Sequence, residues 1–200
     1  MATGQSAVLT RQPAESWELP SRGVVGMLCL ILAEASIFLI FVVAYIYYEG
    51  KSLSGPTPAE VLKLPIFSTI CLLSSSITVH FAVAALKKNK IHLTSLWLAA
   101  TVTLGTIFLV STGIEWHELI YRDGLTLQTN LFGTTYYALV GLHATHVVVG
   151  LLMLTLSLVF SLLGWQTAKH ENRLEVISLY WHFVDAVWVV VFLVVYVLGR

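Results

Sequence analysis

The sequence predicts an all-α membrane protein, a polytopic helix bundle with five transmembrane helices. Hydrophobic residues make up 57% of the 200 residues and charged residues only 11%. The mean hydropathy is +0.82, and five apolar stretches reach the roughly 20 residues that a membrane-spanning helix needs. Lipid admits only helices or closed barrels, and these unbroken stretches lack the alternating pattern of barrel strands.

The chain opens with a polar segment, residues 1–22, which lacks the small-residue cleavage site of a signal peptide. We therefore expect the first apolar stretch to be retained as a span. Turn-forming residues at 55–58 and 122–124 separate the second and fourth spans from what precedes them. No connection is long enough for a separate catalytic domain, so 23–200 should form one domain. The predicted spans are 23–48, 65–86, 95–114, 131–163 and 176–198.

The positions of lysine and arginine predict how the bundle lies across the membrane. Seven of these residues fall on the side of the N-terminus and four on the other side, which places the N-terminus in the cytoplasm and the C-terminus outside. The seven are Arg11, Arg22, Lys87, Lys88, Lys90, Lys169 and Arg173. The four are Lys51, Lys63, Arg122 and Arg200.

Charge and cysteine content exclude several classes of protein. Eleven basic residues balance eleven acidic ones, so there is no basic stripe of the kind that binds nucleic acid. The two cysteines, Cys29 and Cys71, have no metal-ligand spacing and lie in opposite halves of the predicted bilayer. We expect no disulfide between them.

Glu34 lies near the middle of the first predicted span. An ionisable side chain at that depth is costly and usually faces protein, a cavity or a partner. Because desolvation disfavours the charged form, we expect the carboxyl to be protonated or hydrogen-bonded. Two roles stay open: a structural carboxyl bonded to a neighbouring helix, and a group that handles protons.

Histidines mark the fourth and fifth predicted spans. His143 and His146 are three residues apart, and we interpret them as lying on one helix face; His182 and Asp185 repeat that spacing. Three imidazoles and a carboxylate are ligand types that first-row metals accept. Histidine inside a bundle more often hydrogen-bonds between helices, which is the interpretation that we favour.

A haem held by two imidazoles is a second cofactor hypothesis, because its axial ligands must come from opposite sides of the macrocycle. His80 and His182 are the pair that could provide them. Glu115, at the outer end of the third span, lies at the boundary and could reach inward, whereas its neighbours His117 and Glu118 fit an interfacial girdle. We predict no catalytic, metal-binding or cofactor-binding residue in this chain.

Four stretches together carry a resemblance to a known family. They are Glu34 within 30–41, Glu115-Trp116, Gly141-Leu142-His143-Ala144-Thr145-His146-Val147, and Tyr180-Trp181-His182-Phe183-Val184-Asp185-Ala186-Val187-Trp188. From Gly23 to Arg200 the chain resembles haem-copper terminal oxidase subunit III, and the stretch at 180–188 is the most specific part. One departure is Ala144, where the family often has glycine.

The resemblance implies an accessory, non-catalytic subunit of a bacterial respiratory oxidase, the enzyme that reduces oxygen to water and pumps protons. In that family subunit III packs against subunit I, which holds the haems and copper, supports proton uptake and enzyme durability, and holds phospholipid in a membrane cleft. We thus expect oxidase subunits and lipid as partners, and the inner membrane as location. Glu34 matches the family's buried glutamate. The structural polar positions are Glu115, His143, His146, His182 and Asp185.

The family's longer form has seven helices, and the five spans here match its shorter bacterial form. Two other functions stay open on the residues alone. A stand-alone proton-coupled carrier would use Glu34 and Asp185, and a membrane cytochrome would use His80 and His182.

Overall fold

The computed structural model describes residues 21–52, 55–166 and 171–199. Within them, five helices are long and apolar enough to cross a membrane, which confirms the predicted all-α bundle. The C-terminal helix changes to a π-helix, η2, for its last turns. The elements are α1 (Arg22–Tyr48), α2 (Pro58–Val61), α3 (Ile66–Lys87), α4 (Ile91–Tyr121), α5 (Leu131–Leu162), α6 (Glu171–Phe192) and η2 (Leu193–Leu198).

The helices differ from the predicted spans mainly at α4, which extends beyond 95–114 at both ends. Hydropathy ends the span where Glu115 begins a polar stretch, but the backbone stays helical because no turn former occurs before Arg122-Asp123-Gly124. Leu119, buried at 2% exposure, packs that last part against the bundle. Similarly, α6 begins at Glu171, ahead of the predicted 176.

The short α2 was not predicted, because hydropathy carries no signal for a four-residue surface helix. It starts with Pro58, whose fixed φ suits a first helical position. The Thr57 backbone N–H donates to Glu60 Oε2 at 3.0 Å, and this hydrogen bond holds the pKa of Glu60 below its ordinary value. The turn-forming residues at 55–58 therefore lead into the start of a short helix.

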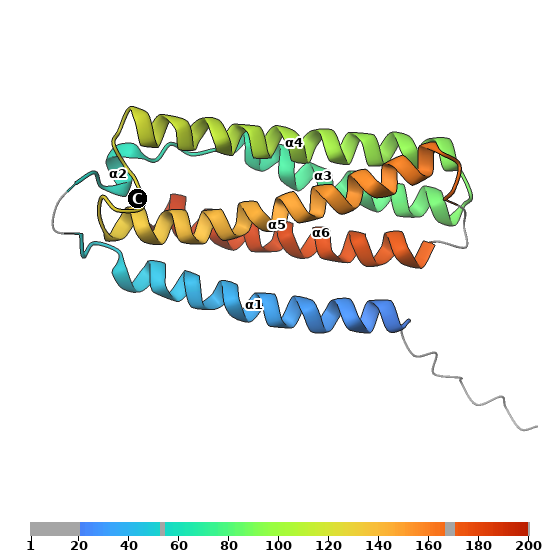
Figure 1. Cartoon of the computed structure of the whole chain (residues 1–200), viewed down its shortest axis with the longest axis horizontal. Helices are drawn as coiled ribbons and strands as arrows, with labels where there is room; N and C mark the ends of the chain where they lie inside the picture. The colour runs from blue at the N-terminus through green and yellow to red at the C-terminus, as the bar shows by residue number, and fades with distance from the viewer. Residues whose placement is uncertain (1–20, 53–54, 167–170, 200) are drawn as a thin grey trace, which may run out of the picture.

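Helices α3, α4, α5 and α6 form a ring in which each packs against its neighbours, and α1 lies outside the ring against α5 and α6 (Figure 1). Neighbours in the ring run antiparallel, as short connections require. Helix α1 is the least buried of the five long helices. Only 11% of its most apolar 18-residue stretch is buried inside the bundle. Its buried residues are Phe38, Val42 and Tyr45.

The two ends of the bundle differ in charge. The turn between α3 and α4, with Lys87, Lys88 and Lys90, lies at the end where α1 begins, and we call this the basic end (Figure 1). The C-terminus lies at the opposite end. The predicted polar segment 1–22 falls almost entirely outside the described residues; Arg22 is the first residue of α1.

Trp181 of α6 fills the centre of the ring. Its indole is fully buried, and its Nε1–H donates to Ser75 Oγ of α3 at 2.9 Å. The ring lies directly on two glycines: a Cβ at Gly150 of α5 would come within 2.7 Å of the indole, and one at Gly105 of α4 within 3.0 Å. One side chain therefore contacts the three other helices of the ring, and the two glycines make room for it.

Hydroxyl groups of serines and threonines link other helix pairs. The hydroxyl oxygens of Thr78 on α3 and Thr101 on α4 lie 2.8 Å apart. Those of Ser95 on α4 and Ser161 on α5 also lie 2.8 Å apart. In lipid, where water is absent, such pairs give each hydroxyl a hydrogen-bond partner. The cysteines are both free, Cys29 exposed on α1 and Cys71 buried on α3.

We expect Gly150→Ala to destabilise the bundle by about 1–3 kcal/mol, because the added methyl group overpacks a rigid indole. The control is Gly26→Ala, since a Cβ at Gly26 of α1 meets nothing within 4 Å; this change should be neutral or slightly stabilising. Thermal unfolding of the purified variants, followed by circular dichroism, makes the comparison. Equal melting temperatures would contradict the close packing of Trp181.

Candidate functional site

Polar side chains within the bundle gather in three clusters, each of which joins helices that are distant in sequence. The Glu34 cluster consists of Glu34, His146 and Tyr180. The Asp185 cluster consists of Ser76, His182 and Asp185. The Glu115 cluster consists of Glu115, Tyr136 and Tyr196.

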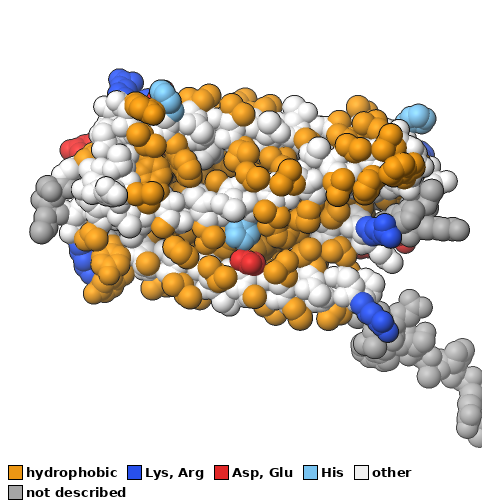
Figure 2. Space-filling view, viewed as in Figure 1, with side chains coloured by type: hydrophobic (Ala, Val, Ile, Leu, Met, Phe, Trp, Pro, Cys, Tyr) orange, Lys and Arg blue, Asp and Glu red, His pale blue; other side chains and the backbone are white. Residues whose placement is uncertain are grey.

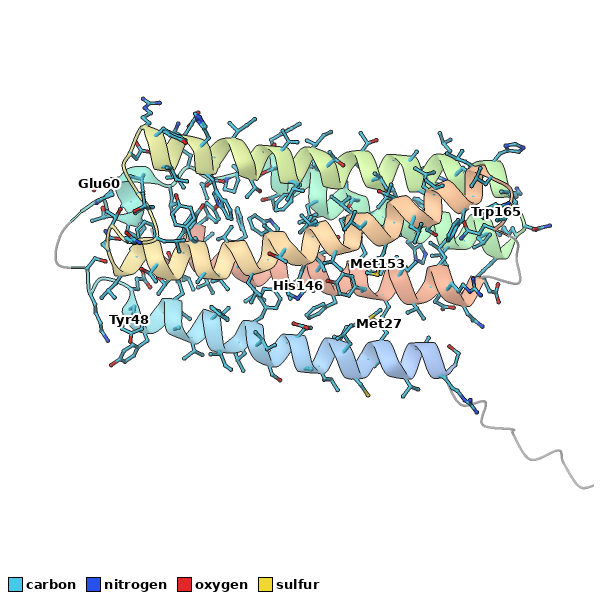
Figure 3. All side chains as sticks on the ribbon, in the orientation of Figure 1. Met27, Tyr48, Glu60, His146, Met153 and Trp165 are labelled. Carbon is cyan, nitrogen blue, oxygen red and sulfur yellow. The ribbon has the colours of Figure 1, made fainter. Side chains whose placement is uncertain are left out.

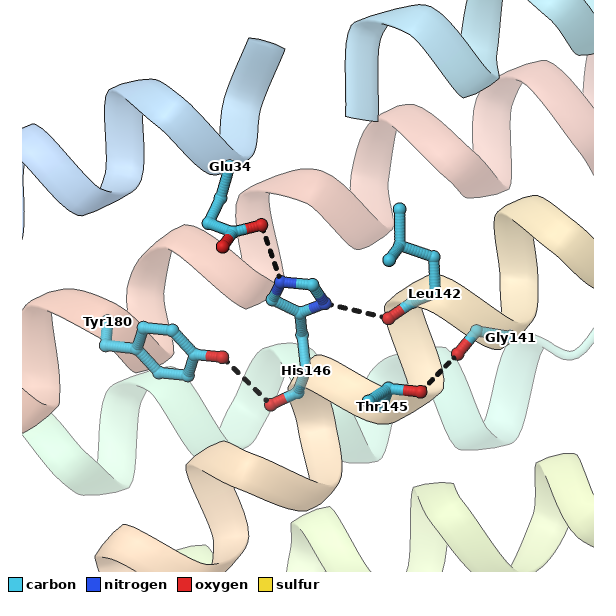
Figure 4. Close-up of polar contacts among 6 residues, drawn as sticks. All are labelled: Glu34, Gly141, Leu142, Thr145, His146 and Tyr180. Atoms are coloured by element: carbon cyan, nitrogen blue, oxygen red, sulfur yellow. Dashed lines mark hydrogen bonds and ion pairs between the residues drawn. The ribbon is translucent and has the colours of Figure 1, made fainter. Parts of the chain in front are cut away.

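The Glu34 cluster ties α1 to the ring (Figure 4). Glu34 Oε2 lies 3.2 Å from His146 Nε2, and the imidazole's Nδ1 lies 2.8 Å from the Leu142 carbonyl oxygen. The Tyr180 hydroxyl donates to the backbone oxygen of His146 at 3.4 Å. The expectation that Glu34 is hydrogen-bonded is therefore confirmed, and its partner comes from α5.

The geometry fixes how many protons this pair holds. A carbonyl oxygen only accepts, so Nδ1 of His146 must carry a proton. One further proton then lies between Nε2 and Oε2, either on Glu34 beside a neutral imidazole or on an imidazolium beside a carboxylate. Both forms have zero net charge, which is the arrangement that tolerates a low-dielectric site.

A groove of about 320 Å³ opens beside this pair between α1 and α5. The side chains of Glu34 and His146 remain 25% and 13% exposed within it. Figure 2 shows a histidine and an acidic side chain surrounded by hydrophobic ones on this face, where Figure 3 labels His146. The apolar lining, which accommodates a hydrocarbon chain, comes from Met27, Leu30, Val149 and Met153.

The Asp185 cluster joins α3 to α6. The Ser76 hydroxyl donates to Asp185 Oδ2, and His182 Nδ1 lies 3.0 Å from the same Ser76 oxygen. Because Ser76 has a single proton to give, the His182 Nδ1–H is the donor toward it. Asp185 is 4% exposed. Thus His182 and Asp185 share one serine of the neighbouring helix, as an interhelical hydrogen-bonding role requires.

The Glu115 cluster joins α4, α5 and η2 near the end opposite the basic end. Tyr196 donates to Glu115 Oε1 at 2.9 Å and Tyr136 donates to it at 3.4 Å. The two hydroxyl oxygens lie 3.2 Å apart. Glu115 thus reaches inward, whereas His117 and Glu118 are exposed, as expected of an interfacial girdle.

His143 differs from the other polar residues. It is 1% exposed, and neither ring nitrogen has a hydrogen-bond partner. Its ring packs against Trp188 and Phe108, with centroids 4.9 and 5.9 Å apart. His143 and His146 both project from the side of α5 that faces α6, where His143 packs on Trp188 and His146 on Tyr180. The two side chains stand about 60° apart, and His146 also reaches Glu34 of α1.

The proposed metal ligands do not meet. His143 lies in the aromatic core, His146 in the Glu34 cluster, and His182 with Asp185 in a third place. Across the described ranges, no three or more His, Cys, Asp or Glu side chains are grouped so as to hold a metal ion. The geometry therefore gives no support to the metal-ligand hypothesis for this set.

The proposed haem pair does not fit a macrocycle either. Ser76 of α3 is hydrogen-bonded to His182 of α6, so the two helices are in contact at this level. A haem with His182 as an axial ligand would have to lie between them. His80 lies on the exposed face of α3 instead of opposite His182 across a gap. The pair does not have the geometry of two axial ligands.

Sequence reasoning missed the hydroxyl partners of these clusters: Ser76, Tyr136, Tyr180 and Tyr196. The tyrosines carry a signal, because a phenol in an apolar span needs a partner for its hydroxyl where phenylalanine would not. Ser76 carries no such signal, because which of the three consecutive serines at 74–76 contact α6 depends on the rotation of α3.

Comparison with known proteins gives one family. Residues 21–200 match the model of the family described as cytochrome c oxidase subunit III. The chain is 37% identical to cytochrome c oxidase subunit 3 of Synechocystis over 189 residues, covering 90% of this chain and 77% of that protein. It is 34% identical to cytochrome c oxidase subunit 3 of Alkalihalophilus pseudofirmus, covering 83% and 82%. A probable quinol oxidase subunit 3 of Staphylococcus saprophyticus is 30% identical, covering 87% and 88%.

Glu34→Gln should preserve the bundle, because the amide N–H can donate to His146 Nε2 as a protonated carboxyl does. Glu34→Leu leaves that nitrogen unpaired and should cost about 1–3 kcal/mol of unfolding free energy. Thermal unfolding of the two purified variants makes the comparison. If the Gln variant falls apart like the Leu variant, an essential ion pair is the correct description.

Tyr196→Phe removes the shorter of the two hydrogen bonds to Glu115 and should lower the unfolding free energy by about 1–3 kcal/mol. Tyr121→Phe is the matched control, since Tyr121 is 78% exposed and should tolerate the change. Amide hydrogen exchange should rise in η2 for the first variant alone. Unchanged exchange there would remove Glu115 as the anchor of the C-terminal turns.

Proposed function

Because this chain belongs to the cytochrome c oxidase subunit III family, we propose that it packs against oxidase subunit I and stabilises it without performing a chemical step. The chain is a multi-pass membrane protein and an accessory subunit of a haem-copper terminal oxidase, where it partners other oxidase subunits. In such an enzyme, oxygen reduction to water is coupled to proton translocation. The haems and copper belong to subunit I in this proposal.

The observation that carries the proposal is the contrast between the inside and the outside of the bundle. Inside, Glu34, Glu115 and Asp185 each accept or share a hydrogen bond from another helix. Outside, the long helices present mostly apolar side chains, and α1 is the extreme case. A scaffold subunit needs polar groups that hold its own helices together and apolar outer faces that can contact other subunits.

The six polar residues singled out in the sequence therefore act as structural groups in this proposal: Glu34, Glu115, His143, His146, His182 and Asp185. The hydrogen bonds of Glu34, Glu115 and Asp185 to other helices hold those helices in fixed rotation, and the Glu34–His146 pair does so without net charge. A rigid neighbour supports subunit I, and with it proton uptake, by holding its membrane surface in one conformation.

We further propose that the basic end faces the bacterial cytoplasm. Of the described basic residues, Arg22, Lys87, Lys88, Lys90 and Arg173 lie toward that end, against Lys51, Lys63 and Arg122 toward the other. This bias supports a cytoplasmic N-terminus in the inner membrane and an external C-terminus. Residues 23–200 would then be the membrane domain, preceded by a cytoplasmic segment.

The groove beside Glu34 supports a contact with phospholipid. Its lining is apolar apart from the Glu34–His146 pair, Thr145 and the Tyr180 hydroxyl, and it lies between α1 and α5, with Tyr180 contributed by α6. An acyl chain matches that chemistry, and the exposure of the pair leaves room for it to approach. Lipid is thus a proposed partner in addition to the oxidase subunits.

The positions of the residues do not suit either of the two rival functions. A proton-coupled carrier would need Glu34 and Asp185 on a shared path, but they lie in different clusters, one with α5 and the other with α3. A cytochrome would need His80 and His182 separated by a haem, whereas His182 bonds to α3.

Purification from native membranes tests the proposal. We expect the chain in stoichiometric amounts with a haem-copper subunit I, identified by mass spectrometry and by haem spectra of the complex. Transport by the isolated chain in vesicles would support the carrier, and haem bound to the isolated chain would support the cytochrome. Stoichiometric iron or copper held by the chain alone would falsify the accessory role.

A further inference from the structure

The buried tyrosines differ in the groups to which their hydroxyls bond. Tyr137 and Tyr180 donate to backbone carbonyl oxygens, which accept a hydrogen bond but do not hold a proton at neutral pH. Tyr136 and Tyr196 instead donate to Glu115 Oε1, at 3.4 and 2.9 Å. Among the described residues, these two are therefore the buried tyrosines whose hydroxyls meet a group that can act as a base.

A base beside a phenol determines how easily the phenol loses an electron. Removal of one electron makes the phenolic proton strongly acidic, so oxidation is easy only where an acceptor takes that proton at the same time. The Tyr196 hydroxyl already lies at hydrogen-bond distance from Glu115, and the Tyr136 hydroxyl oxygen lies 3.2 Å from that of Tyr196. The proton can therefore move to the carboxylate without a rearrangement of the helices.

The same carboxyl reaches the surface at the end opposite the basic end. Glu115 lines a groove of about 250 Å³, together with Lys63 and Glu118. The last two form an ion pair at 3.3 Å, and their side chains are 77% and 48% exposed. Both phenols bond to Oε1 of Glu115, and no hydrogen bond with another described residue occupies Oε2. A proton taken up by Glu115 can thus be released into this polar groove.

Aromatic rings connect the phenol pair to the outside of the bundle. The ring centroids of Tyr136 and Tyr137 lie 5.1 Å apart, and those of Tyr137 and Trp116 lie 5.5 Å apart. Trp116 is only partly buried. Tyrosine and tryptophan lose one electron far more readily than phenylalanine, and electrons pass rapidly between rings that are in contact. An oxidant that reaches Trp116 can therefore draw an electron from the buried pair.

We propose that the Glu115 cluster is a redox site, at which the Tyr136–Tyr196 pair reduces an oxygen-centred radical, such as a peroxyl radical, and becomes a neutral tyrosyl radical. One electron leaves the phenol by way of Tyr137 and Trp116, and the phenolic proton passes to the Glu115 carboxylate. The peroxyl radical gains that electron and takes a proton from water, which gives a hydroperoxide. When Glu115 releases its proton to the groove, the sum is a phenol and a peroxyl radical converted to a phenoxyl radical and a hydroperoxide.

This reaction is not a step of oxygen reduction, and it does not depend on the proposed function. It follows from the contacts of five side chains within this chain, so the full chain alone is sufficient to test it.

Flash oxidation of the purified chain in lipid nanodiscs tests the site. Photogenerated tris(bipyridine)ruthenium(III) is the one-electron oxidant, and freeze-quench electron paramagnetic resonance detects the radical. We expect a persistent tyrosyl signal that is lost in the double variant Tyr136→Phe/Tyr196→Phe. The matched control is Tyr47→Phe/Tyr121→Phe, at positions that are 61% and 78% exposed, and it should keep the signal. A signal absent from the wild type, or unchanged in the first double variant, would overturn the proposal.

Glu115→Gln separates proton uptake from hydrogen bonding. The amide oxygen still accepts from Tyr196, so circular dichroism and the melting temperature should stay close to those of the wild type, but the amide takes up no proton at neutral pH. The tyrosyl signal should therefore be lost from a folded protein. In the wild type the signal should also form more slowly in D₂O, because the proton and the electron leave together. An undiminished signal in Glu115→Gln would exclude Glu115 as the proton acceptor and overturn the proposal.

Trp116→Phe tests the route of the electron. Phenylalanine keeps an aromatic ring beside Tyr137 but is not oxidised by the ruthenium complex, so the tyrosyl signal should form more slowly. Trp165→Phe, at a position that is 66% exposed, is the control and should leave the rate unchanged. Equal rates in Trp116→Phe and the wild type would exclude the route through Trp116.

Discussion

The fold depends on the position of the Trp181 indole. A fully buried ring that touches two glycines and donates to a serine fixes the distances from α6 to α3, α4 and α5. The same stripe of α6 continues with Asp185, bonded to Ser76, and Trp188, whose Nε1–H donates to Thr69 Oγ1 at 3.2 Å. Once Trp181 is seated, the rotation of α6 is set and the polar clusters follow from it.

A second constraint is electrostatic. Water is absent from the hydrocarbon region, so an acid there must share a proton or accept from a donor. Glu34 does so with an imidazole, Glu115 with two phenols and Asp185 with a serine. In each case another helix of this chain supplies a partner for at least one carboxyl oxygen, which fits a structural role for these acids.

Hydropathy predicted the five helices because lipid imposes length and composition directly on the sequence. The sequence also singled out Glu34, His143, His146, His182 and Asp185, since ionisable residues within a span are rare. The sequence alone could not show which side chains are the hydrogen-bond partners of these residues. That His146 and not His143 reaches Glu34 depends on how α5 is rotated against α1, a helix far away in the sequence. The extent of α4 was missed because helices continue past the hydrocarbon boundary.

The π-helix η2 has a consequence for the spacing of the C-terminal residues. A π-turn closes its hydrogen bonds over five residues where an α-turn uses four, so Tyr196 points where a regular helix would have placed a neighbouring residue. A regular α-helix through the same residues would turn the phenol by about 100°, away from Glu115. The π-turns therefore direct Tyr196 toward its carboxyl partner, a constraint that lipid alone does not impose on an apolar sequence.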